Sequence, residues 1–318
     1  MFESELTNRD IKILDCTFRD GGHLLNWKFK QSTVDSVMSA ISKSGIDYFE
    51  IGYRSSRELS QYKDIGQYAL CNEDYLHRVK EEAGIKNVTV MMDTGKAKKS
   101  DFIEKSDSAI DTIRVATYAQ DIDLAIEHVE DLYSKGYEVF INLMALSHID
   151  KSKQIEILKK VDKLGNNIAA FYFADSFGSM FPGDIKNIIN TIQDNTDVEI
   201  GFHGHNNLQM AIPNSLVAIE YGAKYIDSTL YGQGRGAGNL PTEIICAYLN
   251  SFDNTDRFDI DCLVRVIQDI FLGCADRVDW GYSLESFITG VTDSHPHRIS
   301  ELRGEGLSLI ESFNILKE

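Results

Sequence analysis

Residues 122–144 read IDLAIEHVEDLYSKGYEVFINLM and contain one complete helix-to-strand unit. Apolar residues recur at helical spacing over Ile122–Lys135, which predicts an amphipathic helix. The apolar stripe consists of Leu124, Ile126, Val129 and Leu132. Gly136 suits the end of that helix, and the apolar run Glu138–Met144 is typical of a strand buried on both faces.

The same unit repeats in both directions along the chain. Helical stripes recur over Thr33–Lys43 and Ile155–Leu164, and each lies between short runs rich in β-branched residues. The predicted strands are Lys12–Cys16, Ile46–Ile51, Asn87–Met92, Thr112–Ala116, Glu138–Met144, Ala169–Ala174, Val198–Phe202 and Tyr225–Ser228. Eight such units in about 240 residues indicate an α/β protein of the (β/α)8 TIM-barrel type. A doubly wound open sheet also alternates, but it usually has fewer strands.

The chain divides into one barrel and one tail. We expect the barrel domain over residues 10–255 and a C-terminal helical extension over residues 256–318, because strand alternation stops there. Only 4 prolines occur, and no Ser/Gly linker separates a second domain. The helical pattern reaches residue 318 without a clear stop signal, so the natural chain is expected to be longer.

The composition narrows the classes of partner. Hydrophobic residues make up 43% of the 318 residues and charged residues 25%, an ordinary globular balance. The formal net charge of -17 repels nucleic acid and anionic membranes, so an anionic substrate needs a local positive site. The polar start Met1–Asp10 is no signal peptide, and no apolar run can span a bilayer. The 5 cysteines form no CxxC pair, which favours reduced thiols in the cytoplasm.

A histidine pair follows the predicted seventh strand in Gly201-Phe202-His203-Gly204-His205-Asn206. Residues two apart on a strand point to the same side, so His203 and His205 form a natural chelating pair at the barrel mouth. Taken alone, the pattern could equally describe two solvated histidines on a loop.

A second charged cluster follows the first strand, in Asp15-Cys16-Thr17-Phe18-Arg19-Asp20-Gly21-Gly22-His23. Asp20 can supply the hard oxygen ligand that two histidines lack, and the glycines are expected to allow an unusual backbone path. A salt-bridged surface turn is the alternative. One carboxylate with two imidazoles suits octahedral Mn²⁺ or Mg²⁺, and it also suits a non-haem Fe(II) oxygenase.

Three motifs together carry a family resemblance that covers roughly residues 10–250. They are Thr17-Phe18-Arg19-Asp20-Gly21, His203-Gly204-His205 and the loop Gly232-Gln233-Gly234-Arg235-Gly236-Ala237-Gly238-Asn239. The chain resembles the metal-dependent TIM-barrel lyases and aldolases of the HMG-CoA-lyase-like superfamily. Within it, the chain looks most like the 4-hydroxy-2-oxovalerate aldolases, whose loop reads GxGxGAGN. HMG-CoA lyases carry a Cys in this loop, and carboxyltransferases carry a metal-binding Lys on an inner strand; this chain lacks both.

The resemblance implies roles for individual residues. Asp20, His203, His205 and Asn239 would hold the divalent metal, Mn²⁺ or Mg²⁺. Arg19 would stabilise the enolate oxygen, and His23 would act as the general base. Tyr282, in Gly281-Tyr282-Ser283, is the candidate for a tyrosine that the aldolases carry beyond the barrel, with simple packing as its alternative. Glu50 resembles an acid near the metal, with a salt bridge inside the barrel as its alternative.

The implied activity is a class II carbon–carbon lyase of the aldehyde-lyase type. It would cleave or form a 4-hydroxy-2-oxo acid, with pyruvate or a similar 2-oxo acid and an aldehyde as the small-molecule partners. A Schiff-base mechanism is disfavoured, because Lys12 and Lys224 fall at the amino ends of their strands. A homo-oligomer is expected. An aldehyde dehydrogenase partner is doubtful, because the C-terminal helical extension does not closely match the segment with which the aldolase family contacts its dehydrogenase.

One departure from the aldolase pattern concerns the second substrate. Arg54 and Arg57 follow the second strand and could bind a second anionic group, or they could be ordinary surface charge. Other readings stay open: a synthase that condenses an acyl-CoA with a 2-oxo acid, a non-catalytic barrel domain of a larger protein, and an iron oxygenase.

Overall fold

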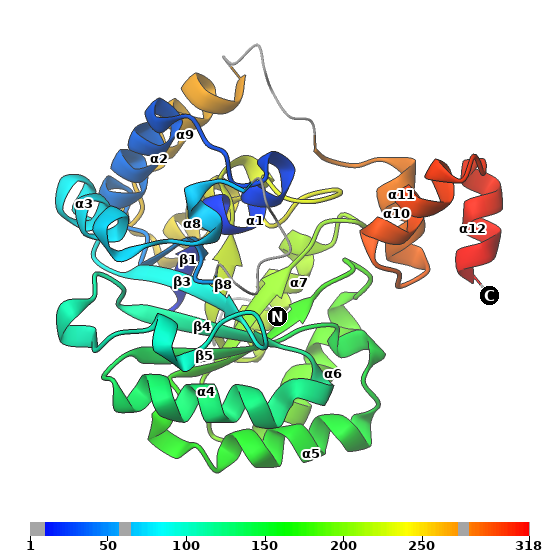
Figure 1. Cartoon of the computed structure of the whole chain (residues 1–318). Coiled ribbons are helices and arrows are strands. Elements are labelled where there is room, and N and C mark those ends of the chain that lie inside the picture. The colour runs from blue at the N-terminus through cyan, green and yellow to red at the C-terminus, as the bar shows by residue number, and fades with distance from the viewer. Residues whose placement is uncertain (1–9, 57–64, 273–279, 318) are drawn as a thin grey trace.

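Eight parallel strands close into a barrel in chain order in a computed structural model, which describes residues 10–56, 65–272 and 280–317 (Figure 1). The strands are β1 (Lys12–Asp15), β2 (Tyr48–Tyr53), β3 (Val88–Asp93), β4 (Thr112–Thr117), β5 (Glu138–Leu143), β6 (Ala170–Asp175), β7 (Ile200–Gly204) and β8 (Ala223–Ser228). Parallel pairing of β1 with β8 completes the barrel. The predicted TIM barrel is confirmed, and each strand lies within a few residues of its predicted position.

Helices surround the strands and continue beyond them. They are α1 (Thr17–Leu25), α2 (Gln31–Lys43), α3 (Glu73–Ala83), α4 (Ile122–Ser134), α5 (Lys151–Asp162), α6 (Pro182–Gln193), α7 (Ala211–Tyr221), α8 (Thr242–Asp253), α9 (Ile260–Val266), α10 (Leu284–Val291), α11 (Pro296–Gly304) and α12 (Leu309–Lys317). The three predicted amphipathic helices correspond to α2, α4 and α5. The predicted stripe of α2 is buried against the barrel. Those of α4 and α5 are buried only in part, since Ile126 and Ile155 are half-buried. The prediction is wrong for Leu124, which is 40% exposed, because the buried face of α4 is centred on Ala125, Val129 and Leu132.

The barrel departs from eight regular strand–helix units at one connection. Between β3 and β4 the chain forms only two short 3₁₀ turns, η2 (Lys99–Asp101) and η3 (Lys105–Asp107). The sequence there, Thr94–Asp111, has no apolar stripe of helical period to bury against the sheet, and such a stripe is what stabilises a barrel helix.

Two apolar layers hold the barrel together. The larger lies between strands and helices and includes Val90, Ile113, Val129 and Ile189. The smaller fills the amino-terminal end of the barrel interior with aromatic rings. Its buried members are Leu14, Cys16, Tyr48, Phe140, Ala170, Tyr172 and Tyr225. This aromatic floor closes the barrel at the amino ends of the strands, and the buried charges Glu50, Arg114 and Asp227 lie beyond it, toward the carboxyl ends.

The chain beyond β8 is helical, as predicted. α9 packs on α2 of the barrel, whereas α10, α11 and α12 form a lobe to one side of the barrel in Figure 1. Asp293, just after α10, accepts hydrogen bonds from Ser147 Oγ at 3.0 Å and Ser179 Oγ at 2.5 Å, and so fastens the lobe to the barrel mouth. Among the described residues, no helix has the length and apolarity needed to cross a membrane.

Candidate active site

The two histidines of β7 converge as their spacing predicts. His203 and His205 are both buried, and their Nε2 atoms lie 3.3 Å apart at the carboxyl end of the strand. Asp20 approaches from α1, with its Oδ2 atom 3.6 Å from His203 Nε2. Nitrogen and oxygen atoms of these three side chains all lie within 4.8 Å of one another, which is the spacing of ligands around a single ion.

Asp20 reaches this position because its segment is helical. The motif Thr17–Gly21 forms the start of α1, which begins only one residue after β1 ends. The expectation of an unusual backbone path at the glycines is wrong, since neither glycine has a positive φ. Their role is close packing: a Cβ atom on Gly21 would lie 2.7 Å from Gln233 Cδ, and one on Gly22 would overlap the Trp27 ring.

The glycine-rich loop after β8 closes over the same point. His205 and Asn239 form an isolated β-bridge, and the backbone N–H of Asn206 donates to Gly238 O at 2.9 Å. A Cβ atom on Gly234 would lie 3.1 Å from Asp20 Oδ1 and 2.2 Å from Asn239 Nδ2. Only glycine at position 234 lets the loop bring Asn239 beside Asp20.

The donor set fits a divalent cation. Asp20 Oδ1 and Asn239 Oδ1 are buried oxygens without a hydrogen-bond partner among the described residues. An unpaired buried oxygen costs about 1–3 kcal/mol, so two beside a pair of imidazoles indicate that a positive partner belongs between them. Two nitrogens and two oxygens with space for substrate would suit Mn²⁺ or Mg²⁺.

Behind these ligands lies a buried ion network that the sequence reasoning missed in part. Glu50, on β2, accepts from Arg19 Nε at 2.7 Å and from Arg114 Nη2 at 2.5 Å. Arg114, on β4, also pairs with Asp227 of β8. Asp227 Oδ2 in turn lies 2.8 Å from His203 Nδ1. Glu50 therefore lies in the salt bridge inside the barrel that was its alternative role, and it acts on the site by holding Arg19.

Arg114 and Asp227 orient the ligands without contacting the metal position. A carboxylate on the far nitrogen of a metal-binding histidine fixes its tautomer and ring orientation, and Asp227 has that place beside His203. The missed signal was a charged residue in the middle or carboxyl half of a mostly apolar barrel strand, Arg114 in TIRVAT and Asp227 in AKYIDS. Such a charge is tolerated inside a barrel only when it is paired.

The protonation states of Asp20 and His205 suit ligands of a cation. Burial alone would raise the pKa of Asp20, but Arg19 and the two histidines outweigh it and lower that pKa well below its usual value. Burial lowers the pKa of His205 to about 3, although Asp20 opposes the shift. The carboxylate is therefore ionised and the His205 ring neutral at pH 7, the forms that bind metals.

His23 lies on the wall of the site, at the end of α1. Its Nε2 atom is 3.3 Å from the Tyr53 hydroxyl, and its ring packs edge-on against Trp27 with centroids 4.5 Å apart. Burial lowers the pKa of His23 well below its usual value, and the positive charge of Arg235 lowers it further. His23 is therefore a neutral imidazole that can accept a proton.

Two other sequence candidates lie apart from this cluster. Tyr282 is 63% exposed and lines a cavity of about 420 Å³ together with Leu24 and Gly236. No contact joins Tyr282 to the metal cluster. The Arg54 guanidinium donates to the backbone oxygens of Asp101 and Cys71, so it is committed to the fold rather than to a ligand. Arg57 lies outside the described residues.

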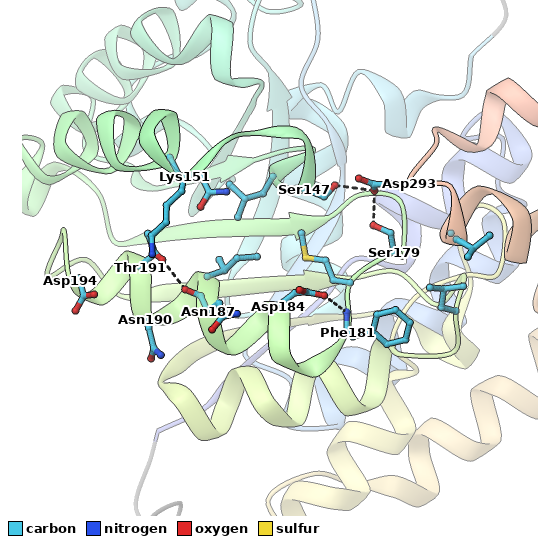
Figure 2. A pocket seen from close by; sticks show the side chains of 17 residues that line it. Ser147, Lys151, Ser179, Phe181, Asp184, Asn187, Asn190, Thr191, Asp194 and Asp293 are labelled. Carbon is cyan, nitrogen blue, oxygen red and sulfur yellow. Dashed lines mark hydrogen bonds between the residues drawn. The ribbon is translucent and has the colours of Figure 1, made fainter. Parts of the chain in front are cut away.

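A cavity of about 800 Å³ lies between α5, α6 and the end of α10 (Figure 2). Its walls carry Ser147, Ser179 and Asp293, whose hydrogen bonds are drawn there, but none of the metal-cluster residues. The cavity is therefore a groove at the junction of barrel and lobe, separate from the barrel mouth.

The fold and the metal-ligand cluster define the class of protein to which the chain is similar. The HMGL-like family model matches residues 10–270, and the chain belongs to this family. Among curated relatives, a 4-hydroxy-2-oxovalerate aldolase of Carboxydothermus hydrogenoformans is 31% identical over 82% of this chain and 77% of its own length. An oxaloacetate decarboxylase of Mycobacterium tuberculosis is 29% identical over 84% of this chain and 78% of its own.

Solved structures agree with the family. The N-terminal domain of a proposed aldolase from Bacteroides vulgatus superposes with a TM-score of 0.82 at 29% identity, over 92% of this chain and 96% of that domain. The hydroxymethylglutaryl-CoA lyase of Pseudomonas aeruginosa gives a TM-score of 0.65 at 18% identity, over 86% of this chain and 96% of the lyase. At that identity the second likeness concerns the fold alone.

Proposed function

We propose that this protein is a divalent-metal-dependent aldolase. It cleaves the C3–C4 bond of a 4-hydroxy-2-oxo acid to give pyruvate, or a similar 2-oxo acid, and an aldehyde. The observation that carries the proposal is the convergence of Asp20, His203 and His205 beside two buried oxygens that lack partners. The relatives named 4-hydroxy-2-oxovalerate aldolase support the same activity.

A divalent cation held by Asp20, His203, His205 and Asn239 would supply Lewis-acid stabilisation of the 2-oxo oxygen as it becomes an enolate. Arg19 strengthens the same effect from the protein side. Two nitrogens of its guanidinium are held by Asp20 and Glu50, whereas its Nη2 is buried without a partner. That remaining donor is preorganised for the enolate oxygen, and such a donor contributes about 2.7–4 kcal/mol to transition-state stabilisation.

His23 removes the proton from the 4-hydroxyl. As that O–H bond breaks, the C4–O bond becomes the carbonyl of the aldehyde, and the C3–C4 electron pair moves into the enolate. The enolate then takes a proton at C3 to give the 2-oxo acid. The Tyr53 hydroxyl, 3.3 Å from His23 Nε2, orients the ring for this transfer.

A lysine-based mechanism has no support in the barrel mouth. Lys12 and Lys224 lie at the amino ends of β1 and β8, and both pair with nearby acids. The remaining parts of the proposal follow the family: Mn²⁺ or Mg²⁺ as the ion, a cytoplasmic homo-oligomer, a barrel domain over 10–255 with an extension over 256–318, and Tyr282 at the substrate entrance.

Decarboxylation of oxaloacetate is a second candidate, because one relative is named for it. Loss of CO₂ from oxaloacetate yields the same enolate but has no hydroxyl proton to remove, so it needs the metal and Arg19 without His23. His23 therefore distinguishes the two reactions, and its neutral, half-buried ring favours the aldolase.

The test loads the purified protein with Mn²⁺ and measures pyruvate release from 4-hydroxy-2-oxovalerate and from oxaloacetate, using wild type and His23→Gln. We expect cleavage of the hydroxy acid, a loss of about 10²–10⁴-fold in His23→Gln, and no comparable loss for oxaloacetate. The aldolase proposal is wrong if the Mn²⁺ protein releases no pyruvate from any 4-hydroxy-2-oxo acid. It is also wrong if borohydride traps pyruvate on a lysine.

A further inference from the structure

The glycine-rich loop carries a cation directly above the metal cluster. Arg235 stands between Gly234, which passes against Asp20, and Gly236, whose backbone oxygen accepts a hydrogen bond from Gly281 N at 3.2 Å. The loop is thus anchored on both sides of Arg235. In a chain of net charge -17, a cation in this place balances a field that otherwise repels anionic substrates.

The Arg235 side chain is not committed to the protein. It is half-buried, its Nε is buried without a hydrogen-bond partner, and no described carboxylate forms an ion pair with it. The other arginines of the site behave differently, because Arg19 and Arg114 pair with buried acids. A half-buried guanidinium without a partner has donors left for a ligand, and its planar fork matches carboxylate and phosphate.

The charge of Arg235 acts on the side of the site where the base lies. It adds to burial in lowering the pKa of His23, and it also acts on His205 and on His295 at the start of α11. The residues that flank Arg235 place it between the metal cluster and the lobe, because a Cβ atom on Gly234 would lie 3.1 Å from Asp20 Oδ1 and one on Gly236 would lie 3.6 Å from Ser286 Oγ of α10. Next to it, Leu24 and Gly236 line the cavity of about 420 Å³ that leads toward α10.

We propose that Arg235 binds an anionic group, a carboxylate or a phosphate, on the aldehyde half of the substrate. This inference rests on the proposed aldolase activity. The C4 hydroxyl must lie within hydrogen-bond reach of His23, so the C4 substituent extends past His23 toward Arg235. The 2-oxo acid half is accounted for by the metal position and by Arg19 Nη2 at the enolate oxygen. The aldehyde product is accordingly an anionic aldehyde rather than a simple alkanal.

The experiment runs the reaction in the condensation direction with pyruvate and Mn²⁺. Three aldehydes are compared: propionaldehyde, succinic semialdehyde and glycolaldehyde phosphate. We expect wild type to prefer one of the anionic aldehydes by about 10-fold or more in kcat/KM. Arg235→Gln should lower that preference by about 10–100-fold, mainly through KM, which is the effect of one charge-assisted hydrogen-bonding group. The preferred anion separates carboxylate from phosphate.

Two further variants isolate the local effect. Arg235→Lys keeps the charge without the planar fork and should retain part of the preference. Lys224→Gln removes the same unit charge at the opposite end of the barrel, where Lys224 pairs with Glu199 at 2.8 Å. We expect it to keep the wild-type preference. Should Lys224→Gln reduce the preference as much as Arg235→Gln, the effect is one of net charge and the proposal fails.

Three other results would overturn the inference. Equal losses for neutral and anionic aldehydes would mean that Arg235 acts only through His23. A raised KM for pyruvate with every aldehyde would place Arg235 on the other half of the substrate. If no aldehyde reacts, the aldolase proposal itself fails; titration of wild type and Arg235→Gln with succinate and inorganic phosphate then still decides whether Arg235 forms an anion site, because equal binding by both proteins excludes it.

Discussion

The two ends of the barrel interior are built from opposite materials. At the amino ends of the strands, here called the lower end, Tyr48, Phe140 and Tyr225 pack at tilted angles with ring centroids 5.0–5.9 Å apart. At the carboxyl ends, here called the upper end, the interior is filled by buried carboxylates, guanidinium groups and imidazoles. The boundary is the Tyr172 ring, which has the Arg114 guanidinium 4.8 Å from its centroid. The lower end stabilises the fold through apolar packing and takes no part in the chemistry. The upper end holds buried charges that would destabilise the fold if they were not paired.

The largest expected effect on activity comes from removing a metal ligand at the upper end. Asp20→Asn keeps the shape of the side chain but removes the negative charge that lies beside the Nε2 atom of His203. Because Lewis-acid stabilisation amounts to several kcal/mol, we expect aldol cleavage to fall by at least about 10³-fold. Bound Mn²⁺ measured by metal analysis after gel filtration should fall with it. Full activity with stoichiometric Mn²⁺ would contradict the ligand assignment.

The second prediction tests whether the upper end depends on pairing. Arg114→Met leaves Glu50 and Asp227 buried without their shared cation, and breaking a buried ion pair on one side costs about 3–5 kcal/mol. Urea denaturation should show this loss, together with weaker metal binding, since Asp227 no longer holds His203 firmly. Unchanged stability would mean that the two carboxylates have other partners.

The third prediction makes the matching change at the lower end. Phe140→Ala removes a buried ring of the aromatic floor and should cost about 3–5 kcal/mol through lost packing. Unlike Arg114→Met, it should leave kcat/KM per folded molecule and Mn²⁺ affinity at wild-type values, measured where both proteins are folded. A large change in catalysis would show that the two ends are mechanically coupled.

The fourth prediction concerns the ligand support alone. Asp227→Asn keeps a hydrogen-bonding group beside His203 Nδ1 but removes the charge that fixes the tautomer. Outer partners of this kind typically contribute 10–100-fold to metal affinity or activity, and we expect a loss of about that size. Isothermal titration with Mn²⁺ gives the value, and a loss no smaller than that of Asp20→Asn would make Asp227 a direct ligand instead.

The last prediction changes stability outside the metal cluster, at Asp15, which lies between the inward-facing residues of β1 and α8. Burial raises the pKa of Asp15 to about 6, despite hydrogen bonds from Thr17 N and the Thr242 hydroxyl. The folded protein therefore holds this proton more tightly than the unfolded chain, so stability decreases as pH rises from about 4 to about 6. Asp15→Asn should flatten the pH dependence of the melting temperature over this window by the equivalent of about 3 kcal/mol, since each unit of pKa shift corresponds to about 1.4 kcal/mol. A curve parallel to wild type would exclude Asp15 as the titrating group.

The sequence predicts the barrel well because strand and helix periods are local properties. Eight apolar runs separated by helical stripes leave few other topologies, and each run became a strand. The β3–β4 connection has no α-helix, and the lack of an apolar stripe in its sequence could have predicted this. The motif after β1 was assigned to an irregular segment, because two adjacent glycines obscure a helix that tertiary contacts with Gln233 and Trp27 stabilise.

The site was predictable where spacing determines direction and not where it depends on distant partners. His203 and His205 follow from strand parity, and Asp20 follows from its place after β1. Nothing local reveals that Arg114 reaches both Glu50 and Asp227 across the barrel, or that Arg54 is bound by backbone oxygens while Arg235 is left without an acidic partner. Except for Cys71, which is 17 positions from Arg54, the partners of Arg54 and Arg114 lie more than 40 positions away in the chain.

The immediate start of α1 after β1 bears on how this site tolerates redesign. Arg19 and Asp20 are consecutive residues of one helical turn, so the anion-binding and cation-binding groups keep a fixed angle to each other. A one-residue insertion between Asp15 and Asp20 would rotate both by about 100° around the helix axis. New specificities are therefore best introduced at the glycine-rich loop or the C-terminal lobe, with this one connection kept at its native length.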